Sequence, residues 1–222
     1  SVACGGGGGA SNNPVAPGDP PPPPSQASAN ATYRVTFDAT WSALTHPDGI
    51  PANPHFSPLV GATHAADTRF WEMGVTASDG IKAMAEEGKT TPLDAEIDAA
   101  IGQGTAESLL LGGGVPVSPD TVRIEFTTSL DHSHVTLVSM LAPSPDWFVG
   151  VSALPLLEDG DWAQLIEVEL FAYDAGTDGG KNYTAANKPL VPREPIERAE
   201  GAPFVVDGEL RAVGSFTFRR IG

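Results

Sequence analysis

Several segments of the chain alternate apolar and polar side chains, which is the pattern of a half-buried β-strand. In the first of them, Val35, Phe37, Ala39 and Trp41 lie on one face. The segments with this alternation, or with the apolar run typical of a central strand, are residues 33–41, 121–128, 135–141, 147–154, 163–173 and 210–220. About six antiparallel strands of this kind predict a mainly β fold, built as a sandwich.

Helical signals lie between the first strand and the others. Residues 77–87 are predicted to form a short helix, and Thr91-Pro92 offers an N-cap and a first-turn proline for a second helix through Ile101. Residues 42–66 have no clear periodicity and are predicted to be irregular, and residues 175–208 are predicted to be a long polar loop. The helices are therefore expected as a short insertion in an all-β architecture.

Residues 1–31 differ in composition from the rest of the chain. They contain five consecutive glycines and the prolines of residues 20–24, so they cannot build a hydrophobic core. We expect residues 1–31 to form a flexible tether and residues 32–222 to form one globular domain. Cys4 is the only cysteine, which excludes an intramolecular disulfide.

The net charge of the chain limits the kinds of molecule that it is expected to bind. The 222 residues include 28 acidic and 12 basic side chains, giving a formal net charge of −16. Such a surface repels phosphate backbones and anionic lipids, so nucleic-acid binding is not expected. No apolar stretch approaches the roughly 20 residues that a membrane-spanning helix needs.

Two short acidic segments follow apolar strands and carry the main candidate chemistry. One is Pro143-Ser144-Pro145-Asp146-Trp147, and the other runs from Asp174 through Gly176 to Asp178. Carboxylates in such loops can converge on a hard cation such as calcium, which prefers several oxygen ligands. The alternative is turn chemistry, because Asp side chains also bond nearby backbone amides and glycine permits tight bends.

The five histidines are candidates for zinc ligands or catalytic groups. His132 and His134 would share a face if residues 132–134 were extended, but no third zinc ligand is evident. His46, His55 and His64 lie in the segment predicted to be irregular. We expect their rings to bond buried loop backbone.

Other candidates favour structural roles. Glu158, Asp159 and Asp161 are expected at a solvated hairpin tip, and Ser152 lacks the second glycine of a nucleophile elbow. The tryptophans are expected to pack in the core and at its rim, and the side chain of Trp147 is of most interest because it adjoins Asp146. The sequence nominates no catalytic pair.

The segment Ser1-Val-Ala-Cys4, followed by glycines, resembles the lipobox of a bacterial lipoprotein. The resemblance implies a chain processed from a precursor with a signal peptide, with a lipid on Cys4. Ser1 departs from the pattern, which usually has leucine at that position. The alternative is an ordinary flexible tail with an incidental cysteine.

Ordered motifs across residues 32–222 resemble the spondin N-terminal domain family. These motifs are Tyr33-Arg-Val-Thr-Phe37, Trp41-Ser42, His46-Pro47, His55-Phe-Ser-Pro-Leu59, Gly61-Ala-Thr-His64, Phe70-Trp71, Ala77-Ser78, Leu137-Val-Ser-Met140, Ala142-Pro-Ser-Pro-Asp-Trp-Phe-Val-Gly-Val151 and Asp174-Ala-Gly-Thr-Asp178. The resemblance implies an eight-stranded antiparallel β-sandwich with Ca2+ bound at one end. It also implies that Asp146, Asp174 and Asp178 are the metal ligands.

The same resemblance implies a non-catalytic adhesion module, extracellular or displayed at the cell surface, as on a bacterial outer-membrane lipoprotein. Its expected partner is a matrix or surface protein or glycan. Animal members carry cysteines near the segment that here reads 157–161, and this chain has none there. The alternatives are a structural subunit of an extracellular assembly and a hydrolase acting on matrix or cell-wall polymers.

Overall fold

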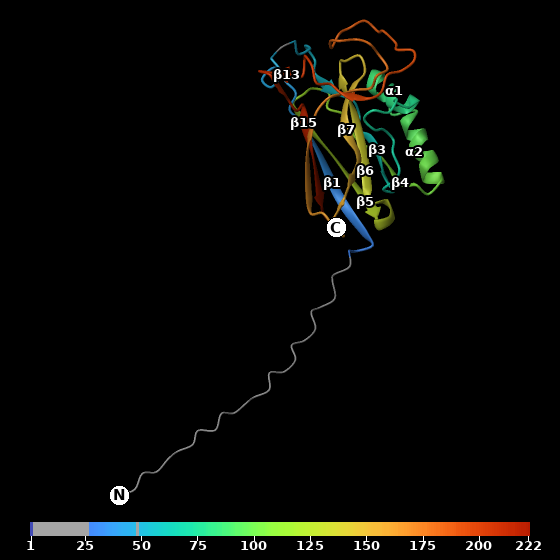
Figure 1. Ribbon diagram of the computed structural model, residues 1–222, viewed down its shortest axis with the longest axis vertical. Coiled ribbons are helices and arrows are strands. Elements are labelled where there is room, and N and C mark those ends of the chain that lie inside the picture. The colour runs from blue at the N-terminus through green and yellow to red at the C-terminus, as the bar shows by residue number, and fades with distance from the viewer. Residues whose placement is uncertain (2–26, 48) are drawn as a thin grey trace.

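Two antiparallel β-sheets pack face to face, with two helices on the outer face of one of them (Figure 1). The computed structural model describes residue 1, residues 27–47 and residues 49–222. Within these residues, eight strands have five or more residues, and the remaining strands have two each. The predicted mainly β, antiparallel sandwich is confirmed. Most of the predicted tether, including Cys4, lies outside the described residues.

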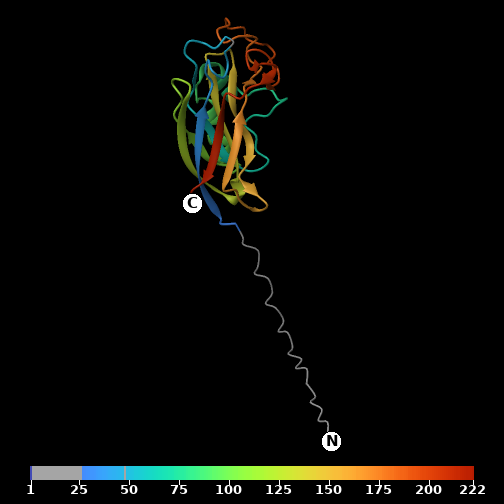
Figure 2. The ribbon, with the colours of Figure 1, turned by 90° about the vertical axis from the view of Figure 1, so that its left-hand side faces the viewer.

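The first sheet has four strands, and its inner face forms half of the core. Its order is β10 (Leu165–Leu170), β15 (Gly214–Arg220), β1 (Asn30–Ala39) and β5 (Asp120–Ser129). Figure 2 shows these strands side by side, in orange, red, blue and olive. The alternation predicted for β1 is confirmed, because Val35, Phe37 and Ala39 are fully buried. Trp41 is also buried, although the strand ends two residues before it.

The second sheet has seven strands and contributes the other half of the core. Its order is β12 (Glu197–Arg198), β11 (Tyr173–Asp174), β7 (Trp147–Pro155), β6 (His134–Ala142), β3 (Val60–His64) and β4 (Ala106–Leu111), with β2 (His55–Phe56) beside the end of β6. Two small hairpins and a 3-10 turn complete the described elements: β8 (Leu157–Glu158) with β9 (Asp161–Trp162), β13 (Val205–Val206) with β14 (Glu209–Leu210), and η1 (Leu130–His132).

Five sequence-based boundaries are corrected. Residues 175–208 are not one loop, because they contain β12, which joins the second sheet, and β13. Residues 42–66 are not wholly irregular, since they contain β2 and the fully buried β3, and β4 was not predicted. Residues 163–173 form two strands in different sheets, because the chain crosses between sheets after Leu170. The last long strand begins at Gly214, after a half-buried Ala212. The first begins at Asn30, two residues before the expected domain boundary.

The helices cover the outer face of the second sheet. Helix α1 spans Asp79–Glu87, and the Ser78 hydroxyl caps it by accepting the N–H of Ile81 at 3.1 Å. Helix α2 spans Leu93–Gly102. Thr91 does not cap α2 as predicted, because Pro92 occupies the N-cap position and the Thr91 hydroxyl donates to the Asp94 carboxylate. A second apolar cluster joins the helices to the sheet through Ile81, Met84, Leu93, Ile97, Val60, Val138 and Phe148.

A buried polar relay joins the three neighbouring strands β3, β6 and β7. His64 Nδ1 lies 2.9 Å from the carbonyl of Ala65, so this nitrogen carries the hydrogen and Nε2 accepts from Thr136 Oγ1 at 2.8 Å. Thr136 Oγ1 in turn accepts the N–H of Ala153 at 3.0 Å. The pairing register of β6 and β7 shifts at this position. The predicted bond from His64 to loop backbone is therefore confirmed.

Replacing Thr136 with valine should destabilise the fold by about 2–3 kcal/mol. The substitution keeps the shape of the side chain, but it leaves Nε2 of His64 and the Ala153 amide unpaired in the interior. Urea denaturation measures the change, and Thr136→Ser, which keeps the hydroxyl, is the matched control. A valine variant within about 0.5 kcal/mol of the wild type would show that the relay contributes little.

Candidate metal centre

The two acidic loops meet because they lie at the same end of the second sheet, where β7 begins and β11 ends. Strand β7 begins at Trp147, immediately after Asp146, and β11 ends at Asp174. The two strands are antiparallel neighbours, and Asp174 lies directly opposite Trp147. The loop after Asp174 therefore passes beside Asp146. The sequence predicted this proximity, and the pairing of β11 with β7 explains it.

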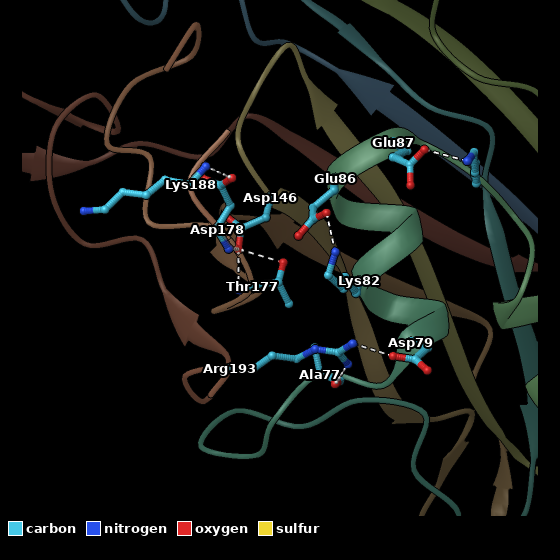
Figure 3. Close-up of polar contacts among 11 residues, drawn as sticks. Ala77, Asp79, Lys82, Glu86, Glu87, Asp146, Thr177, Asp178, Lys188 and Arg193 are labelled. Carbon is cyan, nitrogen blue, oxygen red and sulfur yellow. Dashed lines mark hydrogen bonds and ion pairs between the residues drawn. The ribbon is translucent and has the colours of Figure 1, made fainter. Parts of the chain in front are cut away.

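Asp146 is fully buried beneath the second acidic loop. Its Oδ2 accepts the backbone N–H groups of Thr177 at 2.7 Å and Asp178 at 2.9 Å, and the Thr177 hydroxyl at 3.1 Å (Figure 3). The other carboxylate oxygen, Oδ1, is also buried, but it has no hydrogen-bond partner among the described residues. A buried carboxylate oxygen without a partner is costly and calls for a ligand that supplies positive charge.

Burial also disfavours the ionised forms of the Asp146 and Asp174 carboxylates. It raises the pKa of Asp146 to about 6, with the negative charge of Asp174 as the second cause, while the bonds from Thr177 and Asp178 oppose the rise. Burial likewise raises the pKa of Asp174, although the N–H of Gly176 stabilises its charge. None of the ion pairs between described residues includes either carboxylate. A cation between them would relieve both effects.

The remaining contacts of Asp174 and Asp178 are those of turn-forming aspartates. Asp174 accepts the N–H of Gly176 at 2.8 Å and the indole N–H of Trp147 at 3.3 Å. Asp178 accepts the N–H groups of Gly180 and Lys188, both at 2.7 Å. Each of these four oxygens holds one donor, and an ionised carboxylate oxygen has room for a second partner. The turn chemistry considered as an alternative is therefore present, and it leaves capacity for an ion.

The three carboxylates do not form a ready-made triad. In the part of the chain that the structure describes, no group of three or more His, Cys, Asp or Glu side chains is arranged to hold a metal ion. Asp146 and Asp174 lie close enough to interact electrostatically, whereas Asp178 contacts Asp146 through its backbone N–H. The joint ligation by Asp146, Asp174 and Asp178 stays a prediction.

Glycine at position 176 permits the tight second loop. Its φ of +69° lies in the left-handed region, and a Cβ there would lie 2.2 Å from the carbonyl oxygen of Glu194. The N–H of Glu194 also donates to the Gly176 carbonyl at 2.8 Å. The acidic loop is thus held against the later part of the long connection that follows it.

That long connection, residues 175–204, is fixed at both of its sides. Tyr183 and Phe204 pack edge to face on the Trp147 ring, with ring centroids 5.4 and 5.0 Å away. Arg193 donates to the carbonyl of Ala77 at 2.9 Å and pairs with Asp79 at the start of α1 (Figure 3). The acidic loop therefore rests on an aromatic base and is anchored to a helix.

The other sequence candidates take structural roles. All four tryptophans are buried, so their predicted packing role is confirmed and Trp147 is no exposed platform. Glu158, Asp159 and Asp161 are exposed at the β8–β9 hairpin, as expected. The Ser152 hydroxyl donates to the carbonyl of Trp71.

The remaining histidines also have local partners. The extended arrangement considered for residues 132–134 is not formed, because His132 lies in a 3-10 turn and bonds the Gly104 carbonyl, while the His134 ring lies beside that of His64. His55 bonds loop backbone at the Asn53 carbonyl, as predicted. His46 bonds the Thr45 hydroxyl instead of the backbone.

Comparison with known proteins agrees with this architecture. The Spondin_N family model matches residues 31–204. Spondin-1 of Gallus gallus is 36% identical over 176 residues, which are 77% of this chain and 22% of that protein. Spondin-2 of Homo sapiens is 33% identical over 175 residues, which are 77% of this chain and 53% of that protein. The matched region thus spans only part of each relative, and on this evidence the chain belongs to the Spondin_N family.

Proposed function

We propose that this protein is a calcium-binding, non-catalytic module that acts outside the cell. The observation that supports calcium best is the unpartnered Oδ1 of the fully buried Asp146. Calcium prefers carboxylate and carbonyl oxygens and tolerates irregular geometry, which suits a site built from two loops. Asp146, Asp174 and Asp178 would hold the ion, together with backbone carbonyls or water.

The role of the ion would be structural. Asp146 precedes β7, whereas Asp174 is the last residue of β11 and Asp178 lies on the connection after it, so an ion bound to all three would tie the two loops together. Bound calcium would offset the repulsion between Asp146 and Asp174, and these residues would in turn fix the loop that begins at Ala175. A binding surface presented by this end of the sandwich would then depend on calcium for its shape.

Membership in the Spondin_N family supports an adhesion function. The proposed partner is an extracellular matrix or surface protein or glycan, and the proposed location is extracellular or at the cell surface. Lipidation of Cys4 is part of the same proposal, and Cys4 lies outside the described residues. A structural subunit of an extracellular assembly is the second candidate, and the same tether would then pack against neighbouring chains.

Local contacts favour a binding module over a hydrolase. A hydrolase needs a nucleophile or base within hydrogen-bond reach of a second titratable group in a cleft. Ser152 bonds a backbone carbonyl, and in the described chain none of its hydrogen bonds reaches a histidine. The buried carboxylate of Asp146 is occupied by backbone amides on one oxygen.

Equilibrium dialysis with radioactive calcium tests the proposal directly. We expect the chelator-treated wild-type protein to bind one ion per chain, and Asp174→Asn to weaken the affinity by at least tenfold, on the order of the loss of one charged ligand. Glu158→Gln, which removes an exposed carboxylate from the β8–β9 hairpin, is the matched control and should bind like the wild type. Equal binding by the Asp174 and Glu158 variants would place the ion elsewhere.

A further inference from the structure

Within the described part of the chain, one flank of the sandwich has two strand edges without a partner. Strand β10 is the last strand of the four-stranded sheet, and its one described neighbour is β15 (Figure 2). Strand β7 pairs with β11 only at Trp147 and Phe148, so its edge over residues 149–155 is open as well. Across the described residues, no backbone hydrogen bond other than those with β6 reaches residues 149–155. On the opposite flank, the last strands of the two sheets, β4 and β5, contact each other, so the two sheets are not separated there.

The direction of the free backbone groups on β10 follows from its pairing. The Gln164 carbonyl accepts the N–H of Arg220, and the Leu170 carbonyl accepts that of Val213. Backbone groups alternate in direction along an antiparallel strand. The N–H and C=O groups of Leu165, Glu167 and Glu169 therefore point away from β15, toward the open flank.

A groove lies between these two edges. A cavity of about 460 Å³ is bordered by residues 150–154 of β7 and by Val168, Glu169 and Phe171. Residues of the segment 69–73, with Tyr173 and Arg198, complete its lining, so its own cations are Arg69 and Arg198. Val168 and Leu154 are half-buried side chains that pack against the core at this opening. The groove thus offers apolar contacts beside a row of unpaired backbone groups, which are the two requirements for adding an extended strand.

Charge on the outer face of β10 selects the partner. Glu167 and Glu169 are exposed, and their opposite neighbours on β15 are Thr217 and Ser215. Neither glutamate takes part in an ion pair between described residues. A cationic side chain on an added strand would lie directly opposite each carboxylate, and such cross-strand pairs are favourable.

The same charges argue against a second copy of this chain. Two β10 edges paired about a two-fold axis would set Glu167 and Glu169 of one copy against the same residues of the other. Like charges directly opposite are destabilising. The net charge of −16 adds to this repulsion and favours a basic partner.

We propose that the β10 edge binds an extended polypeptide segment in which basic and apolar residues alternate. The segment would add antiparallel to β10, with its basic side chains opposite Glu167 and Glu169 and its apolar side chains against the groove. The proposal is independent of the calcium site, because none of its residues is a candidate ligand. A calcium-free protein should therefore bind the same segment.

The probe is a fluorescein-labelled, seven-residue peptide of alternating lysine and valine, followed by fluorescence anisotropy. We expect saturable binding with a dissociation constant below about 100 μM, as for a short peptide held by a few backbone bonds and ion pairs. Two isomers methylated on backbone nitrogens separate strand addition from charge attraction. Methylation of the lysine nitrogens, which face β10 in the antiparallel register, should abolish binding, whereas methylation of the valine nitrogens should not. Equal binding by both isomers, or the absence of saturable binding, would overturn the proposal.

Two protein variants complete the test. Glu167→Lys/Glu169→Lys should weaken binding by roughly tenfold, while Glu158→Lys/Glu200→Lys, with the same change in net charge at other exposed sites, should stay within about twofold. Leu165→Pro removes one N–H from the open edge without a change in charge, and it should weaken binding by roughly fivefold. Melting curves identify any variant that fails to fold. Equal losses in both double variants would indicate charge attraction alone and would contradict strand addition.

Discussion

Chelation of calcium is expected to lower the melting temperature by about 5–10 °C. An ion at a hundredfold excess over its dissociation constant stabilises the folded state by about 2.7 kcal/mol. In a domain of this size, each kcal/mol corresponds to about 2–4 °C. Differential scanning calorimetry with calcium and with a chelator measures the difference, which should decrease as the calcium concentration is lowered.

Asp174→Asn should reduce this difference by at least about half, because it replaces one of the two carboxylates that interact beneath the loop and a tenfold weaker affinity leaves about 1.4 kcal/mol of stabilisation. Glu158→Gln is again the matched control, and it should keep the full calcium effect. A melting temperature that stays constant across a calcium titration of the wild type would contradict a structural role for calcium. A calcium effect of full size in the Asp174 variant would instead exclude Asp174 as a ligand.

The strands that alternation predicts are those with one face in the core. In β1, burial alternates residue by residue, and the sequence alternates with it. Strand β6 is buried on both faces, and its apolar run predicts a central strand without indicating its neighbours. Local pattern is sufficient in these cases because the packing environment of each position is uniform along the strand.

Strand β3 could not be predicted because its stability comes from its neighbours. It consists of Val60-Gly-Ala-Thr-His64, which is neither alternating nor strongly apolar, yet all five residues are buried between β4 and β6. A Cβ at Gly61 would lie 2.0 Å from the carbonyl of Thr136, so close strand packing requires this glycine. The polar ring of His64 can be buried because Thr136 forms a hydrogen bond with it. Both reasons depend on residues more than 70 positions away.

In the acidic site as well, local sequence predicts some features, whereas others depend on residues far away in the chain. The positions of Asp146 and Asp174 after apolar runs predicted that they lie at strand ends, and β7 and β11 confirm this. The orientation of each carboxylate could not be predicted. Asp178 turns to the amides of Gly180 and Lys188, and Arg193 holds the long loop against α1. These bonds depend on how the 175–204 connection folds back, which no periodicity encodes.

The contribution of Asp146 to the stability of the calcium-free protein should fall as the pH rises from about 4 to 7. Burial raises the pKa of Asp146 from 3.8 to about 6, so the folded state binds this proton more tightly than the unfolded state does. The resulting stabilisation is complete below pH 4 and is lost as the pH rises through 6. A pKa difference of about 2 corresponds to about 3 kcal/mol.

Urea denaturation in the presence of a chelator measures this effect, with Asp146→Asn as the reference. Other groups also titrate in this range, including His64, whose pKa burial lowers, and subtraction of the variant's profile removes their contribution. The difference in unfolding free energy between wild type and variant should change by about 3 kcal/mol between pH 4 and pH 7. Saturating calcium should abolish this dependence on pH, because at pH 7 the ion balances the negative charge that burial disfavours. If the difference in unfolding free energy stays constant with pH in the chelated protein, the amide donors of Asp146 already stabilise its ionised carboxylate.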